Sequence, residues 1–376
     1  MRKIQMVDLH SQYEKIKSEI DEAISDVIKS TAFIKGAKVG EFASELASYL
    51  DVKHVIPCGN GTDALQIAIM SLGLKPSDEI ICPDFTFIAS AEVIGLLGYR
   101  PVFVDVDYDS FNVTAKNIEQ AISIKTKAII PVHLFGQAAP MEAILEIAKK
   151  YDLYVIEDTA QAIGADYIFS DGRKQKLGTI GTIGCTSFFP SKNLGCYGDG
   201  GALFTNDDEL AERLKMIANH GMKVRYHHDI LGVNSRLDTI QAAILSKKLK
   251  YLDRYEQTRQ EAAKKYDEAF GNIDDLVIPK KETFSTHVYH QYTLKVKNGK
   301  RDDLRTFLEQ NGIPSMVYYP VPLHKQKAFL PIARQGGALN ISETLAEQVL
   351  SLPMHTELDE EQQTYIICKV REFFNK

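Results

Sequence analysis

Short apolar runs alternate with helical patterns from about residue 50 to residue 220, and this alternation restricts the fold more than any other feature of the chain. It is typical of an α/β unit in which helices cover a largely parallel sheet. We expect seven strands, over residues 54–58, 79–82, 101–105, 128–132, 154–158, 186–189 and 202–205. Helical patterns fall between them at residues 62–74, 141–151 and 207–220, and Asn206 is a candidate cap for the last of these.

A second, smaller part follows this α/β unit. Helical patterns rich in Lys, Glu and Ala run from Leu237 to about Phe270, and a new segment begins near Ile273, with the strand-like text HVYHQYTLKV after it. Helical text continues through Phe374, and a length of 376 residues also suggests two domains. We therefore expect a large domain over residues 1–255, with an N-terminal helical segment, and a small C-terminal α/β domain over residues 256–376.

Composition argues against several classes of function. The net charge is −6 and no basic stretch interleaves with aromatic residues, which argues against binding to nucleic acid. No apolar run approaches the roughly 18 residues of a membrane span, and the N-terminus lacks the apolar region of a signal peptide, so we expect a cytoplasmic protein. Five cysteines without a CxxC pair predict reduced, buried thiols, and the scattered histidines predict no metal site.

Two segments carry candidate catalytic residues. The text IEDTAQ ends a predicted strand and places Asp158 and Gln161 past the carboxyl edge of the sheet, where ligands of open α/β sheets bind. Such a carboxylate can also simply cap the next helix. Lys192 stands in a glycine-rich loop between two predicted strands, where desolvation would lower its pKa, as Schiff-base chemistry with a carbonyl requires. If the glycines only turn a hairpin, Lys192 is instead a solvated lysine.

A third segment suits a phosphate. CGNGTDALQIAI reads as a strand, a glycine turn and a helix, and the free amides at the helix start, with the Thr62 hydroxyl beside Gly61, favour an anion. Phe87 follows another predicted strand and is placed to stack on a cofactor ring, although a lone aromatic residue is more often part of the core. A phosphate cradle, the Asp158 carboxylate for a pyridine nitrogen and a Schiff-base lysine at Lys192 together predict a pyridoxal phosphate enzyme.

With these residues in place, the sequence resembles the DegT/StrS family of nucleotide-sugar aminotransferases, which are fold-type I pyridoxal phosphate enzymes. The resemblance covers nearly the whole chain and rests on the ordered blocks VDLHSQY, TAFIKGAKV, NGTDAL, PDFTFIASAE, PVHLFGQ, IEDTAQAIGA, SFFPSKNLG, GDGGALFTND, GVNSRLDTIQAAIL and LSLPMH. It implies that Lys192 forms the Schiff base with pyridoxal 5′-phosphate and that Asp158 pairs with the pyridine nitrogen. Gln161 would lie by the phenolic oxygen, and Phe87 would stack on the ring.

The resemblance also implies an active site shared between two subunits. Gly61, Thr62 and Ser187 would hold the cofactor phosphate, and Asn234 would reach that phosphate from the other subunit of a homodimer. Phosphate carries up to two charges and several acceptor atoms, so donors must converge on it from several segments.

The activity that the resemblance implies is transamination. L-glutamate would donate the amino group, a keto sugar would accept it, and Lys192 would move the proton between the substrate Cα and the cofactor C4′. Relatives in which histidine replaces this lysine are dehydrases, so Lys192 favours transfer. The alternatives are a non-catalytic regulatory protein that binds pyridoxal phosphate, and another reaction of this cofactor, such as decarboxylation or elimination.

The strings around Lys192 and Asn234 look closest to aminotransferases that act at C3 of UDP-2-acetamido-2-deoxy-3-keto-glucuronate, for surface polysaccharides such as the lipopolysaccharide O-antigen. The alternative substrate is a dTDP-3-keto-6-deoxyhexose. Arg236 is a candidate for a bidentate contact with a carboxylate of glutamate or of the uronate, or for an ion pair between subunits. The candidates for the sugar pocket are His324, Tyr319 and Tyr318, of which Tyr318 departs from the histidine expected there in the uronate enzymes.

Overall fold

The computed structural model describes residues 2–375, which form twelve α-helices and fifteen β-strands. The helices are α1 (Leu9–Ser30), α2 (Ala37–Leu50), α3 (Gly61–Ser71), α4 (Ala89–Leu96), α5 (Ala115–Ala121), α6 (Met141–Tyr151), α7 (Asp208–Ala218), α8 (Thr239–Leu249), α9 (Leu252–Phe270), α10 (Arg301–Gln310), α11 (Asn340–Gln348) and α12 (Glu360–Phe374). The strands are β1 (His54–Cys58), β2 (Glu79–Pro83), β3 (Arg100–Val104), β4 (Thr126–Ile129), β5 (Tyr154–Asp158), β6 (Asp166–Ile168), β7 (Lys174–Lys176), β8 (Ile183–Ser187), β9 (Gly201–Thr205), β10 (Met222–Val224), β11 (His227–His228), β12 (Leu276–Val277), β13 (Tyr292–Val296), β14 (Arg334–Gln335) and β15 (Val349–Leu352).

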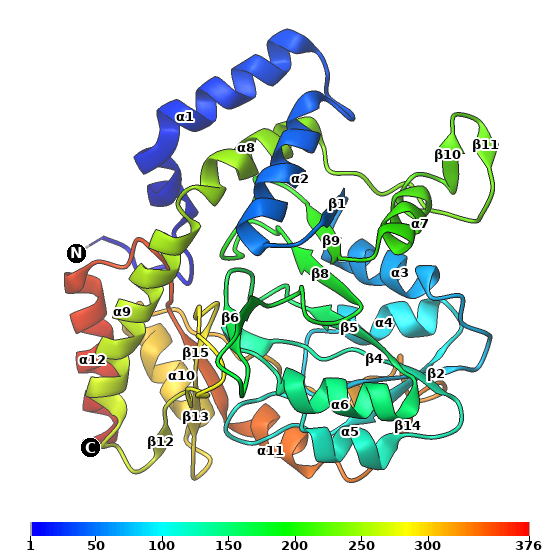
Figure 1. Ribbon diagram of the computed structural model, residues 1–376. Helices are drawn as coiled ribbons and strands as arrows, with labels where there is room; N and C mark the ends of the chain where they lie inside the picture. Colours follow the sequence, from blue (N-terminus) through cyan, green and yellow to red (C-terminus); the bar gives the residue numbers. More distant parts are fainter. Residues whose placement is uncertain (1, 376) are drawn as a thin grey trace.

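The centre of the fold is an eight-stranded sheet with the order β1-β9-β8-β5-β4-β2-β3-β14 (Figure 1). Within it β9 pairs antiparallel with β1 and β8, and the other pairs are parallel. The seven predicted strands are all present. The eighth strand, β14, was not predicted, because a strand of two residues has no recognisable sequence pattern. The strand predicted at residues 186–189 is β8, which begins three residues earlier and ends two residues earlier, at Ser187.

Helices cover both faces of this sheet. On one face α3, α4 and α7 pack against alternate strand residues such as Ile56 and Leu203. On the other face α5 and α6 cover the central strands, and α2 and α8 pack against Val55 and Phe204 at the β1–β9 end. A sheet buried on both sides is expected for parallel strands and agrees with their continuous apolar text.

The helices between the strands agree with their predicted positions except at the cap of α7. The helix predicted at residues 141–151 is α6 with the same bounds. The cap of α7 is Asp207, whose Oδ1 accepts a hydrogen bond from the Leu210 amide at 2.9 Å, so the prediction of Asn206 is wrong. Asn206 Oδ1 instead accepts from the Lys53 amide at 3.0 Å, because the side chain turns toward the start of β1.

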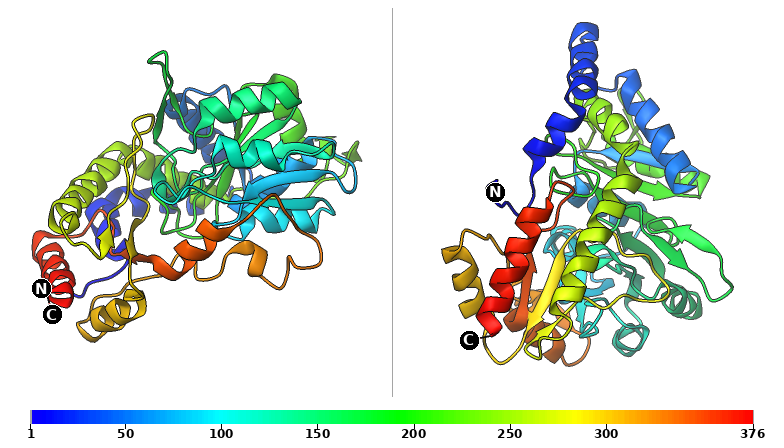
Figure 2. Two further views of the ribbon diagram at one scale, coloured as in Figure 1. Left: turned by 90° about the horizontal axis from the view of Figure 1, so that it is seen from below. Right: turned by 90° about the vertical axis from the view of Figure 1, so that its left-hand side faces the viewer.

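The C-terminal part forms a second, smaller core. Strands β12, β13 and β15 make an antiparallel sheet, and residues of α9, α10 and α12 pack with it around Tyr266. Strand β13 occupies only the second half of the predicted strand-like segment. Both termini lie beside α12 (Figure 2), and Ile4 belongs to this core. Between α10 and β15 the chain returns to the large sheet, where Leu323 and Phe329 join the core beside α4 and β14 pairs with β3.

Thiols and apolar helices complete the description of the fold. The five cysteines are all free. The prediction of buried thiols is wrong for Cys368, which is exposed on α12, and it is confirmed for the other four, which are Cys58, Cys82, Cys185 and Cys196. In the part of the chain that the structure describes, no helix is long and apolar enough to cross a membrane. Over the same residues no group of three or more potential metal ligands is present.

The domain division at residue 255 stays a prediction, and α9 runs through that position without a break.

Candidate active site

The predicted site residues gather at one edge of the large sheet. Strands β1, β2, β5 and β8 point the same way, so their carboxyl ends meet at this edge. The loops and residues that follow them carry most of the predicted site, since Gly61 follows β1, Phe87 follows β2, Asp158 ends β5 and Lys192 follows β8. This is the edge at which open α/β sheets bind ligands.

Asp158 is buried and held in place by two protein donors. Its Oδ2 accepts a hydrogen bond from Ser90 Oγ at 2.8 Å, and its Oδ1 accepts from the Ala160 amide at 3.1 Å. Ser90 is itself buried on α4, and its hydroxyl has one hydrogen to donate, which the carboxylate receives. The carboxylate therefore has a fixed orientation and keeps acceptor capacity for a ligand.

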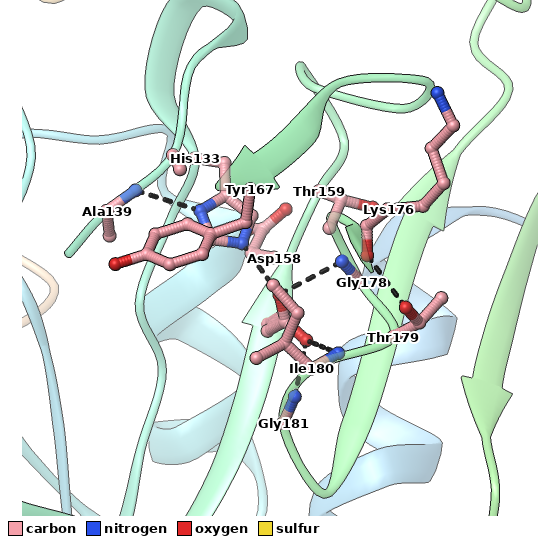
Figure 3. Close-up of polar contacts among 12 residues, drawn as sticks. His133, Ala139, Asp158, Thr159, Tyr167, Lys176, Gly178, Thr179, Ile180 and Gly181 are labelled. Carbon is pink, nitrogen blue, oxygen red and sulfur yellow. Dashed lines mark hydrogen bonds and ion pairs between the residues drawn. The ribbon is translucent and has the colours of Figure 1, made fainter. Parts of the chain in front are cut away.

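The preceding residue, Glu157, anchors the same strand from behind. Its carboxylate is fully buried and accepts from the amides of Gly178, Ile180 and Gly181 at 2.9, 2.7 and 2.6 Å. These amides converge from a single loop (Figure 3). His133 Nε2 lies 3.0 Å from the same carboxylate, while its Nδ1 accepts from the Ala139 amide at 3.1 Å, so Nε2 carries the hydrogen that is donated. Glu157 thus fixes the end of β5 and, with it, Asp158.

Lys192 lies in the tight turn that follows β8. Its amide donates to Phe189 O at 2.8 Å, and the side chain is largely buried. Burial lowers the pKa of Lys192 to about 8, and the nearby Asp158 carboxylate opposes part of this shift. A large share of the amine is therefore neutral near pH 8, which suits the Schiff-base role that the sequence predicts for this position. The role itself stays a prediction.

The start of α3 offers unused donors. In the described chain no protein group accepts from the amides of Gly61 and Thr62, and Asn60 Oδ1 takes the amide of Asp63 at 2.8 Å. A Cβ at Gly61 would lie 2.6 Å from Cβ of Ser187, so only glycine lets the helix start pack this closely against the end of β8. The three residues predicted to hold a phosphate therefore lie together at a helix N-terminus, with two free amides there. The Ser187 hydroxyl accepts from the Phe189 amide at 3.2 Å and keeps its own hydrogen to donate.

Gln161, Tyr319 and Phe87 form the next group. Gln161 Oε1 accepts from the Phe135 amide at 2.8 Å, and its Nε2 donates to Tyr319 Oη at 3.0 Å. Burial raises the pKa of Tyr319 above its usual range, so the phenol is neutral. The Phe87 ring is 53% exposed and lies 6.2 Å from the Tyr319 ring, which leaves its surface available to a flat ligand.

Asn234 and Arg236 lie on the segment that precedes α8. Asn234 is exposed, and neither side chain has a hydrogen bond or ion pair with any described residue. The residue between them, Ser235, is buried and bonds to Asp63 Oδ2 at 2.6 Å and to the Gly59 amide at 2.9 Å. Ser235 thus fixes the segment against the turn before α3. Arg236 and Lys35 are among the residues that line a cleft of about 380 Å³. Their roles toward a partner subunit or a substrate stay predictions.

The structure gives His324 protein partners on both sides. Its Nδ1 lies 2.7 Å from Asp84 Oδ2 and its Nε2 lies 3.1 Å from Glu343 Oε1. Both ring nitrogens are therefore engaged in joining residues 323–343 to the end of β2. The neighbouring Tyr318 is partly buried, which raises its pKa. The sugar contacts proposed for these side chains stay predictions.

Sequence reasoning missed three residues of this region. Ser90 lies in the small-residue text of α4, Asp84 directly follows β2, and His290 lies in strand-like text. Burial, together with the cations Lys192 and Arg259, keeps the pKa of His290 well below its usual range, so its ring is neutral. Among these residues Asp84 had a readable signal, since a polar residue at the carboxyl end of a parallel strand is a candidate site residue.

Relatives of known annotation match the chain over nearly its whole length. A pleiotropic regulatory protein from Geobacillus stearothermophilus is 48% identical over 375 residues, covering 99% of this chain and 98% of its own. The UDP-2-acetamido-2-deoxy-3-oxo-D-glucuronate aminotransferase of Pseudomonas aeruginosa is 46% identical, covering 95% of this chain and 96% of its own. Further relatives, 45% and 40% identical, are named as a UDP-N-acetyl-3-dehydro-glucosamine aminotransferase and a dTDP-3-amino-3,6-dideoxygalactose transaminase.

Solved structures of similar proteins share this fold, and some of them too are named as aminotransferases. A DegT/DnrJ/EryC1/StrS aminotransferase from Brucella abortus is 42% identical and has a TM-score of 0.94, covering 99% of this chain and 100% of its own. A structure of NtdA from Bacillus subtilis, 31% identical with a TM-score of 0.88, covers 99% of this chain and 83% of its own and contains the cofactor PMP. A family model matches residues 14–371, and the chain therefore belongs to the DegT/DnrJ/EryC1/StrS aminotransferase family.

Proposed function

We propose that this aminotransferase moves an amino group from L-glutamate to the C3 keto group of a nucleotide-linked sugar, with UDP-2-acetamido-2-deoxy-3-keto-D-glucuronate as its substrate in surface polysaccharide synthesis. The observation that carries the proposal is Lys192, a largely buried lysine with a pKa lowered to about 8, in the same site as the fixed carboxylate of Asp158. The 46% identical relative named for the uronate supports the choice of sugar.

As a member of this aminotransferase family, the chain uses pyridoxal 5′-phosphate. The residues fit that group, because the amides of Gly61 and Thr62 have no acceptor among the described residues and a Cβ at Gly61 would fill the cradle beside Ser187. When bound, the cofactor supplies an electron sink that stabilises negative charge on the substrate Cα.

The protein side chains then have distinct tasks. The buried Asp158 carboxylate, fixed by Ser90, would keep a proton on the pyridine nitrogen. Gln161 has one Nε2 hydrogen left after its bond to Tyr319, and this hydrogen suits the phenolic oxygen of the cofactor. The amine of Lys192, neutral in part near pH 8, would attach to the cofactor and, once displaced, take the proton from the substrate Cα and return it at C4′.

The experiment that tests this proposal follows the visible absorbance of the purified protein. The cofactor band should be lost when L-glutamate is added and should return when UDP-2-acetamido-3-keto-glucuronate is formed in the same cuvette. Loss without return would keep the amino donor and move the substrate to a dTDP-3-keto-6-deoxyhexose. A band that glutamate leaves unchanged would support a regulatory role over turnover, and Lys192→Ala serves as the control that should show no such band.

The homodimer with a shared site is part of the same proposal. Its support is that the Asn234 side chain is exposed and has no hydrogen bond or ion pair with a described residue, while the segment that carries it is fixed by Ser235. Mixed dimers test it directly. If Asn234 serves the partner's site, subunits carrying Lys192→Ala and subunits carrying Asn234→Ala form dimers with one intact site, so activity at limiting cofactor should rise on mixing. If Asn234 serves its own subunit, mixing restores nothing.

A further inference from the structure

A lysine is fully buried beneath the loop that carries Lys192. Lys248 lies on α8 and is 1% exposed, and its Nζ donates to Gly195 O at 2.5 Å. The Tyr197 ring centroid is 5.3 Å from the same Nζ. In the described chain no carboxylate pairs with Lys248, as the ion pairs found there do not include it. A buried, unpaired ammonium group is costly, so an apolar side chain would fill this place with less penalty.

Two other buried cations show what is unusual about Lys248. Lys295 donates to Tyr108 O at 2.8 Å and has the Asp109 carboxylate at 3.3 Å. Arg259 donates to the main-chain carbonyls of Tyr289 and Met354 in the C-terminal part. Lys248 has no carboxylate partner among residues 2–375, and its acceptor, Gly195 O, belongs to the loop of the active site, three residues after Lys192.

The turn between Lys192 and Gly195 is closed on itself. The Cys196 amide donates to Phe188 O at 2.8 Å, and a Cβ at Gly195 would lie 2.3 Å from Pro190 O. Gly195 is buried, and among the described residues its carbonyl accepts a hydrogen bond from Lys248 Nζ. These close contacts leave the turn little room to deform. A displacement of Gly195 therefore moves the backbone that presents Lys192.

We propose that Lys248 is a positioning residue for the aminotransferase reaction, whose ammonium group fixes Gly195 O and thereby holds the turn that presents the amine of Lys192. This inference rests on the proposed function, since it assigns Lys192 the attachment of the cofactor. Burial lowers the pKa of Lys248 to about 8, with the Cys196 thiol opposing the shift and Arg259 adding to it. Either protonation state of Lys248 retains hydrogens to donate to the carbonyl.

The groups that face Lys192 determine its pKa, which is the quantity that the test measures. Asp158 is the charge that raises its pKa and burial is the cause that lowers it, while the neutral His290 lies close by. A looser turn admits water to the amine, which reduces the desolvation. The pKa of Lys192 should therefore rise when Lys248 no longer holds Gly195.

The first test is Lys248→Met, with Lys250→Met as the matched control, because Lys250 is the exposed lysine at the end of the same helix. We expect the pH midpoint of cofactor attachment to rise by about one pH unit. We also expect kcat to fall about tenfold or more, with KM for L-glutamate within twofold of the wild type. An unchanged midpoint and kcat, with only lower resistance to urea, would reduce Lys248 to a structural residue and overturn the proposal.

A second measurement needs no variant. Native-state hydrogen exchange of the wild-type protein without cofactor should show that the amides of Lys192 and Cys196 open together with those of α8 around Lys248. If the turn amides exchange at least a hundredfold faster than these helix amides, the bond to Gly195 does not hold the turn, and the proposal fails. This outcome does not depend on turnover, so it is distinct from a failure of the proposed function.

Discussion

Ser90 Oγ donates a hydrogen bond of 2.8 Å to Asp158 Oδ2, and both side chains are buried. The bond joins the first turn of α4 to the end of β5, two elements whose sequence positions are 68 residues apart. It therefore sets the direction in which the carboxylate faces the candidate site.

Ser90→Ala should weaken binding of pyridoxal phosphate. Loss of a hydrogen bond to a charged group costs about 1.5 to 3 kcal/mol, which is roughly a 10- to 150-fold weaker affinity if the carboxylate loses its orientation. Cofactor affinity measured by absorbance titration checks this. Ser71→Ala is the matched control, because Ser71 is also a buried helix serine but bonds to Ala68 O. Equal losses in the two variants would contradict the assignment.

The lowered pKa of Lys192 predicts a pH profile. With a pKa of about 8, half of the amine is neutral at pH 8, whereas an ordinary lysine with a pKa of about 10.4 would be neutral in roughly one molecule in 250. Attachment of added cofactor to the cofactor-free protein, trapped by borohydride and measured by mass, should therefore rise through pH 8. A midpoint above pH 10 would show that Lys192 is solvated.

The same shift sets the pH dependence of stability. The folded pKa of Lys192 lies below the unfolded value, so the unfolded chain binds more protons between about pH 8 and pH 10. The free energy of unfolding of the cofactor-free protein should consequently increase with pH across this window, and Lys248, with its pKa also lowered to about 8, adds to the increase. Urea unfolding at pH 8 and pH 10 measures it, with the Lys192→Ala variant as the control that should show a smaller increase.

Local text explains which parts of this molecule were predictable. Lys192, Asp158 and Gly61 each stand beside a buried strand in the sequence, and that short-range context predicts both the sheet edge and the chemistry. The seven central strands follow from the same pattern. The end of β8 was predicted two residues too late, because Phe188 and Phe189 continue its apolar text beyond Ser187.

The contacts that depend on distant segments could not be predicted. His324 and Asp84 are 240 residues apart, and nothing in either neighbourhood indicates that they meet. Strand β14 has only two residues, and its pairing with β3 depends on a long return of the chain. Lys248 lies in helical text rich in lysine, where a buried lysine looks the same as a solvated one. Such positions are fixed by packing between segments, which sequence periodicity does not contain.

His324→Leu should destabilise the fold. The carboxylate of Asp84 is fully buried, and removing the partner of a buried charge costs about 3 to 5 kcal/mol. Burial already raises the pKa of Asp84, so its protonated form favours folding, and the deficit of the variant should shrink as the pH falls. Urea unfolding at pH 5 and pH 8 measures this. Glu343→Gln, which removes the exposed partner, should change stability little. Unchanged stability with a raised KM for the sugar would instead make His324 a substrate contact.

Asn234→Ala should weaken retention of the cofactor. If the amide bonds to the phosphate across the subunit interface, its loss costs about 1 to 2 kcal/mol, or roughly a 5- to 30-fold weaker affinity. Equilibrium dialysis of pyridoxal phosphate at protein concentrations that keep the dimer intact provides the measurement. Asn340→Ala removes an exposed asparagine elsewhere on the surface and should have no effect. An unchanged affinity for Asn234→Ala would separate this residue from the phosphate.

Glu157→Gln tests whether the strand end that carries Asp158 depends on the anchor behind it. A glutamine keeps one acceptor oxygen but turns an NH2 group toward donors, so at least one of the amides of Gly178, Ile180 and Gly181 loses its partner. Breaking a buried charged network of this kind costs about 3 to 5 kcal/mol, and urea unfolding should show it. Glu119→Gln, at an exposed glutamate paired with Lys150, should leave the unfolding midpoint nearly unchanged. Since Asp158 directly follows Glu157, cofactor affinity should fall in the same variant even at low temperature, where the protein is folded. A folded variant with wild-type cofactor affinity would mean that Ser90 alone orients Asp158.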